Sequence, residues 1–144
     1  MAHFAKLDSN NNVINVIVVE NENIQNESGD EVESVGISYC QSLLGGTWKQ
    51  TSYNHNMRGN YAGIGMTYMT GVRTLGVAST DIFIRQQPYS SWSVGINTAE
   101  WYAPEPPGSP PALTTSEADA GKYYEWNESN YQSNPSTAWV LTTP

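Results

Sequence analysis

The shortage of side chains suited to a core is the feature that most constrains this chain. Its 144 residues include nine Tyr and five Trp but only two Phe, and Leu, Ile and Val are sparse for a globular domain of this length. Asn, Ser and Thr are abundant instead. Such a chain can bury only a thin core, and assembly with other chains is a common remedy for a thin core. We therefore expect extended loops and stabilisation by partner proteins.

The net charge of −8 argues against two classes of partner. Nucleic acids are bound by clustered Lys and Arg, whereas this chain has six such residues, well separated. No apolar run approaches the ~20 residues that span a bilayer. Residues 1–4 have neither the basic nor the apolar region of a signal peptide. We expect no nucleic-acid partner, no membrane partner and synthesis in a cytoplasm.

Acidic residues concentrate in one segment of the chain. Six carboxylates lie between residues 20 and 33, without a Lys or Arg among them. No acid occurs from residue 34 to residue 80, a stretch that contains Lys49, Arg58 and Arg73. The simpler interpretation is a solvated acidic loop. The alternative is complementary charge between neighbouring copies, which sets their register more than their affinity.

The first part of the chain predicts a β-hairpin and the one helix. Residues 3–7 and 13–19 favour strands on either side of a turn rich in Asp and Asn. The β-branched run at 13–19 is apolar on both faces, which predicts an inner strand or one buried at an interface. The helix is expected near residues 34–44, with Ser34 as its N-cap and Gly45-Gly46 as its stop. A glycine at position 36 weakens this prediction.

The middle of the chain predicts short strands joined by glycine-rich bends. We expect strands at 47–53, 66–68 and 81–85. The glycines of residues 59–65 lack the Gly-Lys-Ser/Thr sequence and the helix of a phosphate-binding loop. They favour a bend where another backbone approaches closely. Residues 1–87 are thus predicted to form a β-rich N-terminal domain with one helix.

Residues 88–144 predict two Trp-bearing hairpins. Trp92 and Trp101 are symmetric about the Ile96–Asn97 bond, so a four-residue loop at 95–98 would bring the two indoles opposite each other on one face. The proline-rich segment 104–111 is predicted to be an extended, semi-rigid spacer.

The second hairpin runs from residues 122–126 to residues 139–141. An insertion at 132–137 leaves its Trp pairing open. The predicted fold class is therefore mainly β with one short helix, built from small antiparallel sheets and hairpins.

No motif supports catalysis, and we expect no enzyme activity, no cofactor and no metal site. The only imidazoles are His3 and His55, and no acid lies near His55 in sequence. No Ser occupies a nucleophile elbow, which leaves a triad assembled only by the fold as the exception. Residues 27–33 are acidic but lack calcium-loop spacing. The single Cys40 excludes an internal disulfide and a cysteine cluster, and favours a small buried side chain.

The aromatic residues are the clearest functional signal, and three interpretations stay open. Paired Trp residues can cement small hairpins that would otherwise be marginal. Tyr and Trp also suit protein interfaces and stacking against sugar rings. The candidate interface residues are Val16, Val18, Trp48, Tyr61, Tyr89, Trp92, Trp101, Tyr124, Trp126 and Trp139.

Several segments carry a resemblance that covers most of the chain. They are residues 1–8 with 13–19, residues 45–54, residues 58–65, and the tail motifs Pro88-Tyr89-x-Ser91-Trp92, Trp101-x-Ala103-Pro104 and Tyr124-x-Trp126. These segments resemble a family of small, mostly uncharacterised proteins encoded by marine tailed phages, especially cyanophages. Residues 69–80 and the C-terminal insertion depart from the family pattern.

The resemblance implies a role in the phage virion or in its assembly. We expect a homo-oligomeric capsid decoration (cement) protein that contacts other virion proteins. The alternative is a tail, neck or fibre component that recognises a host surface glycan. In that case Trp92, Trp101 and Trp126 should be exposed in a row, whereas cementing predicts that they are buried. The part of the particle, the symmetry, the copy number and the partner protein are not fixed by the sequence.

Overall fold

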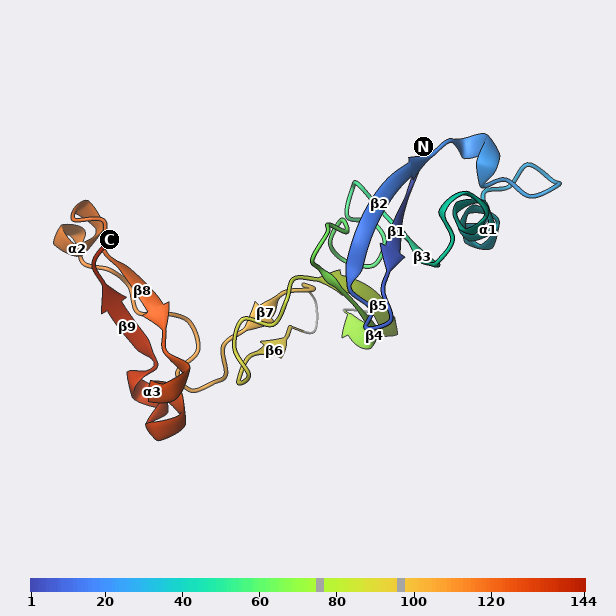
Figure 1. Ribbon diagram of the computed structural model, residues 1–144. Helices are drawn as coiled ribbons and strands as arrows, with labels where there is room; N and C mark the ends of the chain where they lie inside the picture. Colours follow the sequence, from blue (N-terminus) through green and yellow to red (C-terminus); the bar gives the residue numbers. More distant parts are fainter. Residues whose placement is uncertain (75–76, 96–97) are drawn as a thin grey trace. The chain divides into compact units, whose positions relative to one another are not determined.

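The computed structural model describes the backbone of residues 1–74, 77–95 and 98–144, and their side chains except at 72–74 and 77–80. It confirms a mainly β chain with small antiparallel sheets (Figure 1). Among the described residues, α1 (Glu33–Leu44) is the only helix longer than six residues. It matches the predicted helix.

The chain forms two compact units. The N-terminal unit comprises residues 1–86 and 95–100, and the C-terminal unit comprises residues 87–94 and 101–144. Segment 95–100, predicted as part of a C-terminal hairpin, thus belongs to the N-terminal unit. Residues 96 and 97 of the predicted loop lie outside the described residues.

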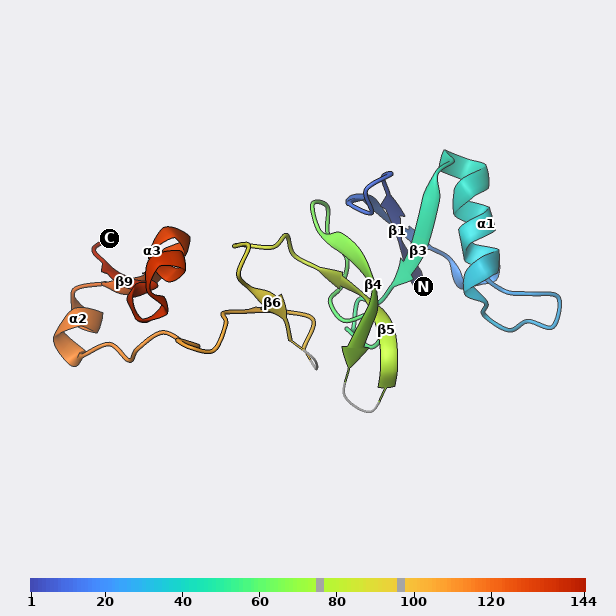
Figure 2. The same cartoon turned by 90° about the horizontal axis from the view of Figure 1, so that it is seen from below.

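A three-stranded antiparallel sheet forms the centre of the N-terminal unit. Its strand order is β2-β1-β3, and the strands are β1 (Ala2–Leu7), β2 (Val13–Val19) and β3 (Thr47–Thr51). β1 and β2 form the predicted hairpin, with a bulge beside Lys6 and Leu7. The helix α1 covers one face of the sheet, and the hairpin of β4 (Thr67–Thr74) and β5 (Val77–Ile84) lies on the other (Figures 1 and 2).

Each face of the sheet has its own buried cluster. The cluster beneath α1 consists of Ala2, Phe4, Val19, Ile24, Cys40 and Trp48. The cluster on the opposite face consists of Ala5, Leu7, Val13, Ala62, Tyr68 and Phe83. Alternate residues of β1 point to opposite faces, so this central strand contributes to both clusters. Cys40 is buried and free, as its position in a helix predicted.

The ends of α1 show which local signals the sequence carried. The helix ends at Gly45, which has a φ of 63°, a conformation that glycine adopts without strain. Its N-cap is Val32 and not Ser34, and no side chain caps it. The Ser34 prediction was wrong because the first helical residue, Glu33, is held by partners outside the helix.

Gly36 allows α1 to approach the sheet. A Cβ atom at this position would overlap Phe4 Cζ and lie 2.8 Å from Ile24 Cγ2. The glycine that weakened the helix prediction is therefore required by packing. Gly59 has a comparable role, because its Cβ would lie 2.6 Å from Ala99 Cβ where its backbone bridges to Phe83. This confirms the predicted close approach.

Two strand predictions need correction. Of the two alternatives for residues 13–19, the inner strand is wrong, because only β1 pairs along β2; a strand buried at an interface stays a prediction. Ile14 and Val18 are 47% and 54% exposed. β4 and β5 are longer than the predicted strands, since they continue through most of the segment 69–80 that was expected to be a connection.

The C-terminal unit consists of two hairpins and short helices. Its elements are β6 (Ser93–Val94), β7 (Trp101–Tyr102), α2 (Thr115–Asp119), β8 (Tyr123–Trp126), α3 (Glu128–Ser133), the 3-10 turn η2 (Pro135–Thr137) and β9 (Trp139–Thr142). β8 pairs with β9, and Trp126 lies opposite Trp139. The predicted insertion forms the end of α3 and η2, and it leaves this pairing intact.

The first hairpin and the proline-rich segment differ from the prediction. β6 and β7 pair with Val94 opposite Trp101, so the predicted register with Trp92 opposite Trp101 was wrong by two residues. The proline-rich segment is not extended throughout. Residues 105–107 form a turn, in which the Gly108 N–H donates to the carbonyl of Pro104 at 2.8 Å.

Candidate functional site

The outer side of β2 is the first candidate site. The Val16 N–H donates to Oδ1 of the preceding residue, Asn15, at 2.9 Å. This N–H therefore points away from β1. Alternate residues of an antiparallel strand direct their backbone groups to the same side, so Val18 faces outward with Val16. Within the described part of the chain, no other backbone pairs with β2 from Ile14 to Val18. We call this segment the β2 edge.

The opposite edge of the sheet is closed by a charged pair. The Gln50 N–H of β3 donates to Glu33 Oε1 at 2.9 Å, and Arg58 Nη1 donates to the Gln50 carbonyl at 2.9 Å. Arg58 also forms a bidentate bond with Glu33. Burial acts to raise the pKa of Glu33, but the bonds from Arg58 and Gln50 outweigh it and lower that pKa. The two edges are therefore unlike: Glu33 and Arg58 cover the outer side of β3 at Gln50, whereas no described residue covers β2 from Ile14 to Val18 in this way.

A second polar group lies between the sheet and the β4–β5 hairpin. The Tyr68 hydroxyl donates to Asp81 Oδ2, and the Lys49 ammonium lies 5.6 Å from the centre of the Tyr68 ring. Burial and the bond to Asp81 raise the pKa of Tyr68 well above its usual range. The same bond lowers the pKa of Asp81. Neither group is set for proton transfer near neutral pH, and the pair joins two strands.

Three tryptophans form the centre of the C-terminal unit. Trp126 packs edge-to-face against Trp92 and Trp139, with ring centres 5.5 and 5.2 Å apart. Trp92 and Trp139 are 6.1 Å apart. Tyr89 and Tyr131 extend the group. Aromatic pairs prefer this geometry and add to the stability of small elements, so this cluster is the core of a unit with few aliphatic residues.

Glu128 joins the segment before β6 to the second hairpin, and sequence reasoning did not identify it. Its carboxylate accepts hydrogen bonds from the side chains of Ser91, Ser90, Trp126 and Gln132, at 2.6, 3.1, 2.9 and 2.8 Å. These donors, Ser91 first, lower the pKa of Glu128 to about 2. Its position directly after β8 and Asn127 is the only feature of the sequence that could have pointed to this role.

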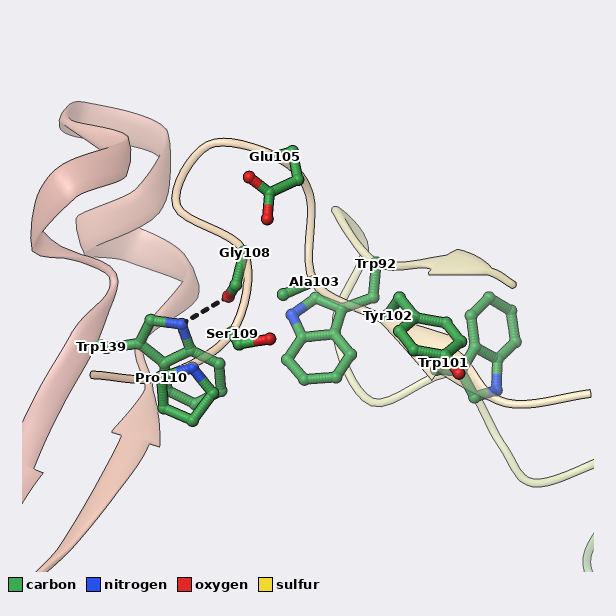
Figure 3. A pocket seen from close by; sticks show the side chains of 9 residues that line it. All are labelled: Trp92, Trp101, Tyr102, Ala103, Glu105, Gly108, Ser109, Pro110 and Trp139. Carbon is green, nitrogen blue, oxygen red and sulfur yellow. Dashed lines mark hydrogen bonds between the residues drawn. The ribbon is translucent and has the colours of Figure 1, made fainter. Parts of the chain in front are cut away.

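The second candidate site is a pocket of about 330 Å³ in the C-terminal unit (Figure 3). It is lined by Trp92, Trp101, Tyr102 and Trp139 together with Ala103, Glu105, Gly108, Ser109 and Pro110. The turn at 105–107 is held against β9 because Trp139 Nε1 donates to the Gly108 carbonyl at 2.8 Å. We call this site the aromatic pocket.

Two polar groups at the aromatic pocket lack partners. Trp92 Nε1 is buried without a hydrogen bond to any part of the chain that the structure describes. The Glu105 carboxylate lies against Gly108, and the described residues offer it no hydrogen bond or ion pair. The pocket therefore presents an unpaired negative charge in a lining that includes the rings of Trp92, Tyr102 and Trp139.

A second hollow, of about 380 Å³, lies in the N-terminal unit and is mostly polar. His3, Gln50, Ser52 and Tyr53 are among its lining residues. The His3 ring stacks on Tyr53 with centres 6.1 Å apart, and the Ser52 hydroxyl bonds to the Asn56 side chain. These residues have structural partners, and their arrangement gives no sign of an activated nucleophile.

The predicted interface residues do not form a single surface. Tyr89, Trp92, Trp126 and Trp139 meet in the aromatic cluster, and Trp101 lines the aromatic pocket. The others lie elsewhere: Val16 and Val18 on β2, Trp48 in the core beneath α1, Tyr61 beside His3, and Tyr124 on β8. Trp126 is only 4% exposed, so the three indoles Trp92, Trp101 and Trp126 do not form an exposed row.

Comparisons with known proteins add no relative. No protein-family model, no curated protein and no solved structure matches the chain. Over the described residues, no group of three or more His, Cys, Asp or Glu side chains could hold a metal ion. The helices within those residues are too short or too polar to cross a membrane.

Proposed function

We propose that this protein is a non-enzymatic structural component that assembles with further copies of itself through the β2 edge. The observation that carries the proposal is the open strand edge with exposed apolar side chains. An unpaired edge is a template for pairing with another chain. Natural proteins usually block such an edge with charged residues or proline, whereas residues 13–19 contain neither.

The positions of the exposed residues suit a two-fold contact. Ile14 and Val18 each lie two residues from Val16 and are both about half exposed. In an antiparallel pair of β2 strands centred on Val16, each Ile14 would lie opposite the partner copy's own Val18. An interface of this kind uses the same patch on both subunits. It would bury both apolar side chains and pair the outward backbone groups of Val16 and Val18.

We propose the virion of a marine tailed phage as the setting, on the strength of the family resemblance. Capsid decoration is the first role within it, because the two thin cores and the open edge suit a small protein that gains stability from neighbours. Its partners would then include the major capsid protein as well as other copies of the chain. We propose no enzyme activity, because the charged groups of the N-terminal unit that have partners, Glu33 with Arg58 and Asp81 with Tyr68, join elements of the fold.

Particles that contain the protein provide the test. Copy number by quantitative mass spectrometry should reach hundreds per particle for a decoration protein. Amide exchange along residues 14–18 should be much slower in the particle than in the isolated chain, because paired backbone groups exchange slowly. Equal exchange in both states would contradict assembly through β2. Absence of the protein from purified particles would contradict the virion role.

A tail, neck or fibre component that recognises the host is the second candidate. The aromatic pocket is the observation that favours it, because ligand sites combine aromatic walls with a few polar groups. A handful of copies per particle would support this role over decoration. The buried Trp126 argues against the simplest form of it, a row of exposed indoles that stacks on sugar rings.

A further inference from the structure

The aromatic pocket has the chemistry of a cation site. The rings of Trp92, Tyr102 and Trp139 come to it from three separate segments of the C-terminal unit, and Trp101 also lines it. The faces of Trp and Tyr rings carry negative potential and attract cations within about 6 Å of the ring centre. The volume of about 330 Å³ is near the lower end for small-ligand pockets. The pocket is therefore sized for a compact ligand group.

The charges around the pocket have one sign. The Glu105 carboxylate is the only charged group among the lining residues, and it has no ion-pair partner within the described chain. The C-terminal unit as a whole contains a single cation, Lys122, against five carboxylates. Lys122 is thus the one cation of the unit that could pair with Glu105 in place of a ligand, and the negative net charge of the unit favours a positive ligand.

The hydrogen-bonding groups of the pocket are few beside its aromatic surface. The Trp139 N–H already donates to the Gly108 carbonyl, and the Trp92 N–H is buried without a partner in the described chain. Glu105 offers only acceptors. The Tyr102 and Ser109 hydroxyls and the Trp101 N–H are the other polar side-chain groups of the lining. A sugar hydroxyl needs both donors and acceptors to replace its bonds to water, whereas an alkylated ammonium group needs neither.

We propose that the aromatic pocket binds a trimethylammonium group, with the methyl groups against the rings and Glu105 as counter-ion. Aromatic enclosure of a quaternary ammonium is an established mode of recognition in proteins. The proposal goes beyond the assembly role of β2, because the site and its ligand lie in the other unit of the chain.

Choline and its neutral isostere 3,3-dimethylbutan-1-ol test the proposal directly. The two molecules have the same shape and differ in charge. Calorimetric titration of the full chain should show choline binding about tenfold more tightly, the difference expected when several rings and a carboxylate act on one cation. Equal affinities would reduce the site to a plain apolar pocket and overturn the proposal. Failure of choline to bind at millimolar concentrations would also overturn it.

Matched variants separate the site from the fold. Glu105→Gln and Tyr102→Leu should each weaken choline binding about three- to tenfold. Glu125→Gln and Tyr123→Leu should leave it unchanged. Tyr102 and Tyr123 are 45% and 46% exposed, so the two Tyr→Leu changes are equal in exposure and differ in position. If all four variants behave alike, the ligand binds elsewhere and the proposal fails.

Two further arms identify the ligand class and its source. Glucose and N-acetylglucosamine should bind at least tenfold more weakly than choline, and tighter binding of either sugar would overturn the proposal in favour of a glycan site. Retention on phosphatidylcholine vesicles but not on phosphatidylglycerol vesicles would identify a lipid headgroup as the source. Binding of free choline without retention on vesicles supports a soluble trimethylammonium compound.

Discussion

Gly36 decides how closely α1 can lie against the sheet, and a single methyl group tests this. Glycine is about 1 kcal/mol less favourable than alanine inside a helix, so helix propensity alone predicts that Gly36→Ala stabilises the protein. The new Cβ would overlap Phe4, and the buried ring has no free space to move into. Overpacking of this kind costs about 1–3 kcal/mol or more. We therefore expect net destabilisation by roughly 1–2 kcal/mol in denaturant unfolding.

The matched control is Ser38→Ala on the exposed side of the same helix. Ser38 is exposed, so the change should raise stability by a few tenths of a kcal/mol through propensity. If Gly36→Ala behaved like Ser38→Ala, α1 would not pack against Phe4 as described.

Glu128 makes the C-terminal unit sensitive to acid. Its pKa is lowered from an ordinary 4.5 to about 2 in the folded chain. The stability that its charge contributes is therefore fully present above pH 4.5 and is lost as the pH falls from 4.5 towards 2. We expect amide protection in β8 and β9 to fall over this range.

In Glu128→Gln the same protection should be lower at neutral pH and should depend less on pH. Glu125→Gln, which changes an exposed carboxylate on β8, should keep the wild-type profile. An unaltered acid response in Glu128→Gln would show that other carboxylates cause it.

At the scale of elements, the two Trp hairpins differ in what their tryptophans do. Trp126 is buried among three other aromatic residues and pairs across the strands with Trp139. Trp126→Ala should cost about 3–5 kcal/mol, the range for large core aromatics. Trp101 is half buried at the pocket wall, so Trp101→Ala should cost only about 1 kcal/mol.

Hydrogen exchange resolved by residue can check this difference. Trp126→Ala should remove protection throughout β8 and β9, while Trp101→Ala should leave it in place. Equal losses in the two variants would mean that the first hairpin contributes as much to the core as the second.

The elements also show what the sequence could predict. Local signals were sufficient for the β1–β2 hairpin, for α1 with its glycine stop, and for the close approach at Gly59. They failed where distant residues decide. The first Trp hairpin takes a register two residues from the symmetric one, and its Trp92 packs on the second hairpin. The proline-rich turn docks through a single bond from Trp139, which no local pattern encodes.

The short helices α2 and α3 illustrate a signal that was present but not used. Thr114 and Glu117 form a capping box at the start of α2, and the Asn127 side chain caps α3. Both motifs are visible in the sequence, but helices of five or six residues have too little apolar periodicity to be predicted from it. The aromatic pocket could not be predicted from the sequence either, because its lining residues come from separate segments that only the fold brings together.

At the scale of the whole molecule, the chain divides its few core residues between two units and leaves the β2 edge of its three-stranded sheet unpaired over the described residues. The β1–β2–β3 sheet is covered on both faces, yet β2 has no neighbour beyond β1. Burial within the chain accounts for Val13 and Val19 but not for Ile14 and Val18, which are 47% and 54% exposed. The proposed partner along the β2 edge would account for these two, because its strand would cover them.

Val18→Lys tests whether the β2 edge carries assembly. Lysine on an edge strand is a natural device against pairing, and two lysines facing Ile14 of the opposite copy would cost their desolvation. We expect the dissociation constant for self-association, measured by analytical ultracentrifugation, to rise about tenfold or more. The stability of the isolated chain should change little, because Val18 is 54% exposed.

Val140→Lys provides the matched control on the C-terminal unit. Val140 is also a β-branched, exposed strand residue, on β9, so it carries the same change in charge without touching the β2 edge. If both lysine variants weaken association equally, net charge and not strand pairing governs it. If only Val18→Lys weakens self-association, the β2 edge is the assembly surface. The exposed, uncharged residues of β2 are then explained by contact with a second copy of the chain.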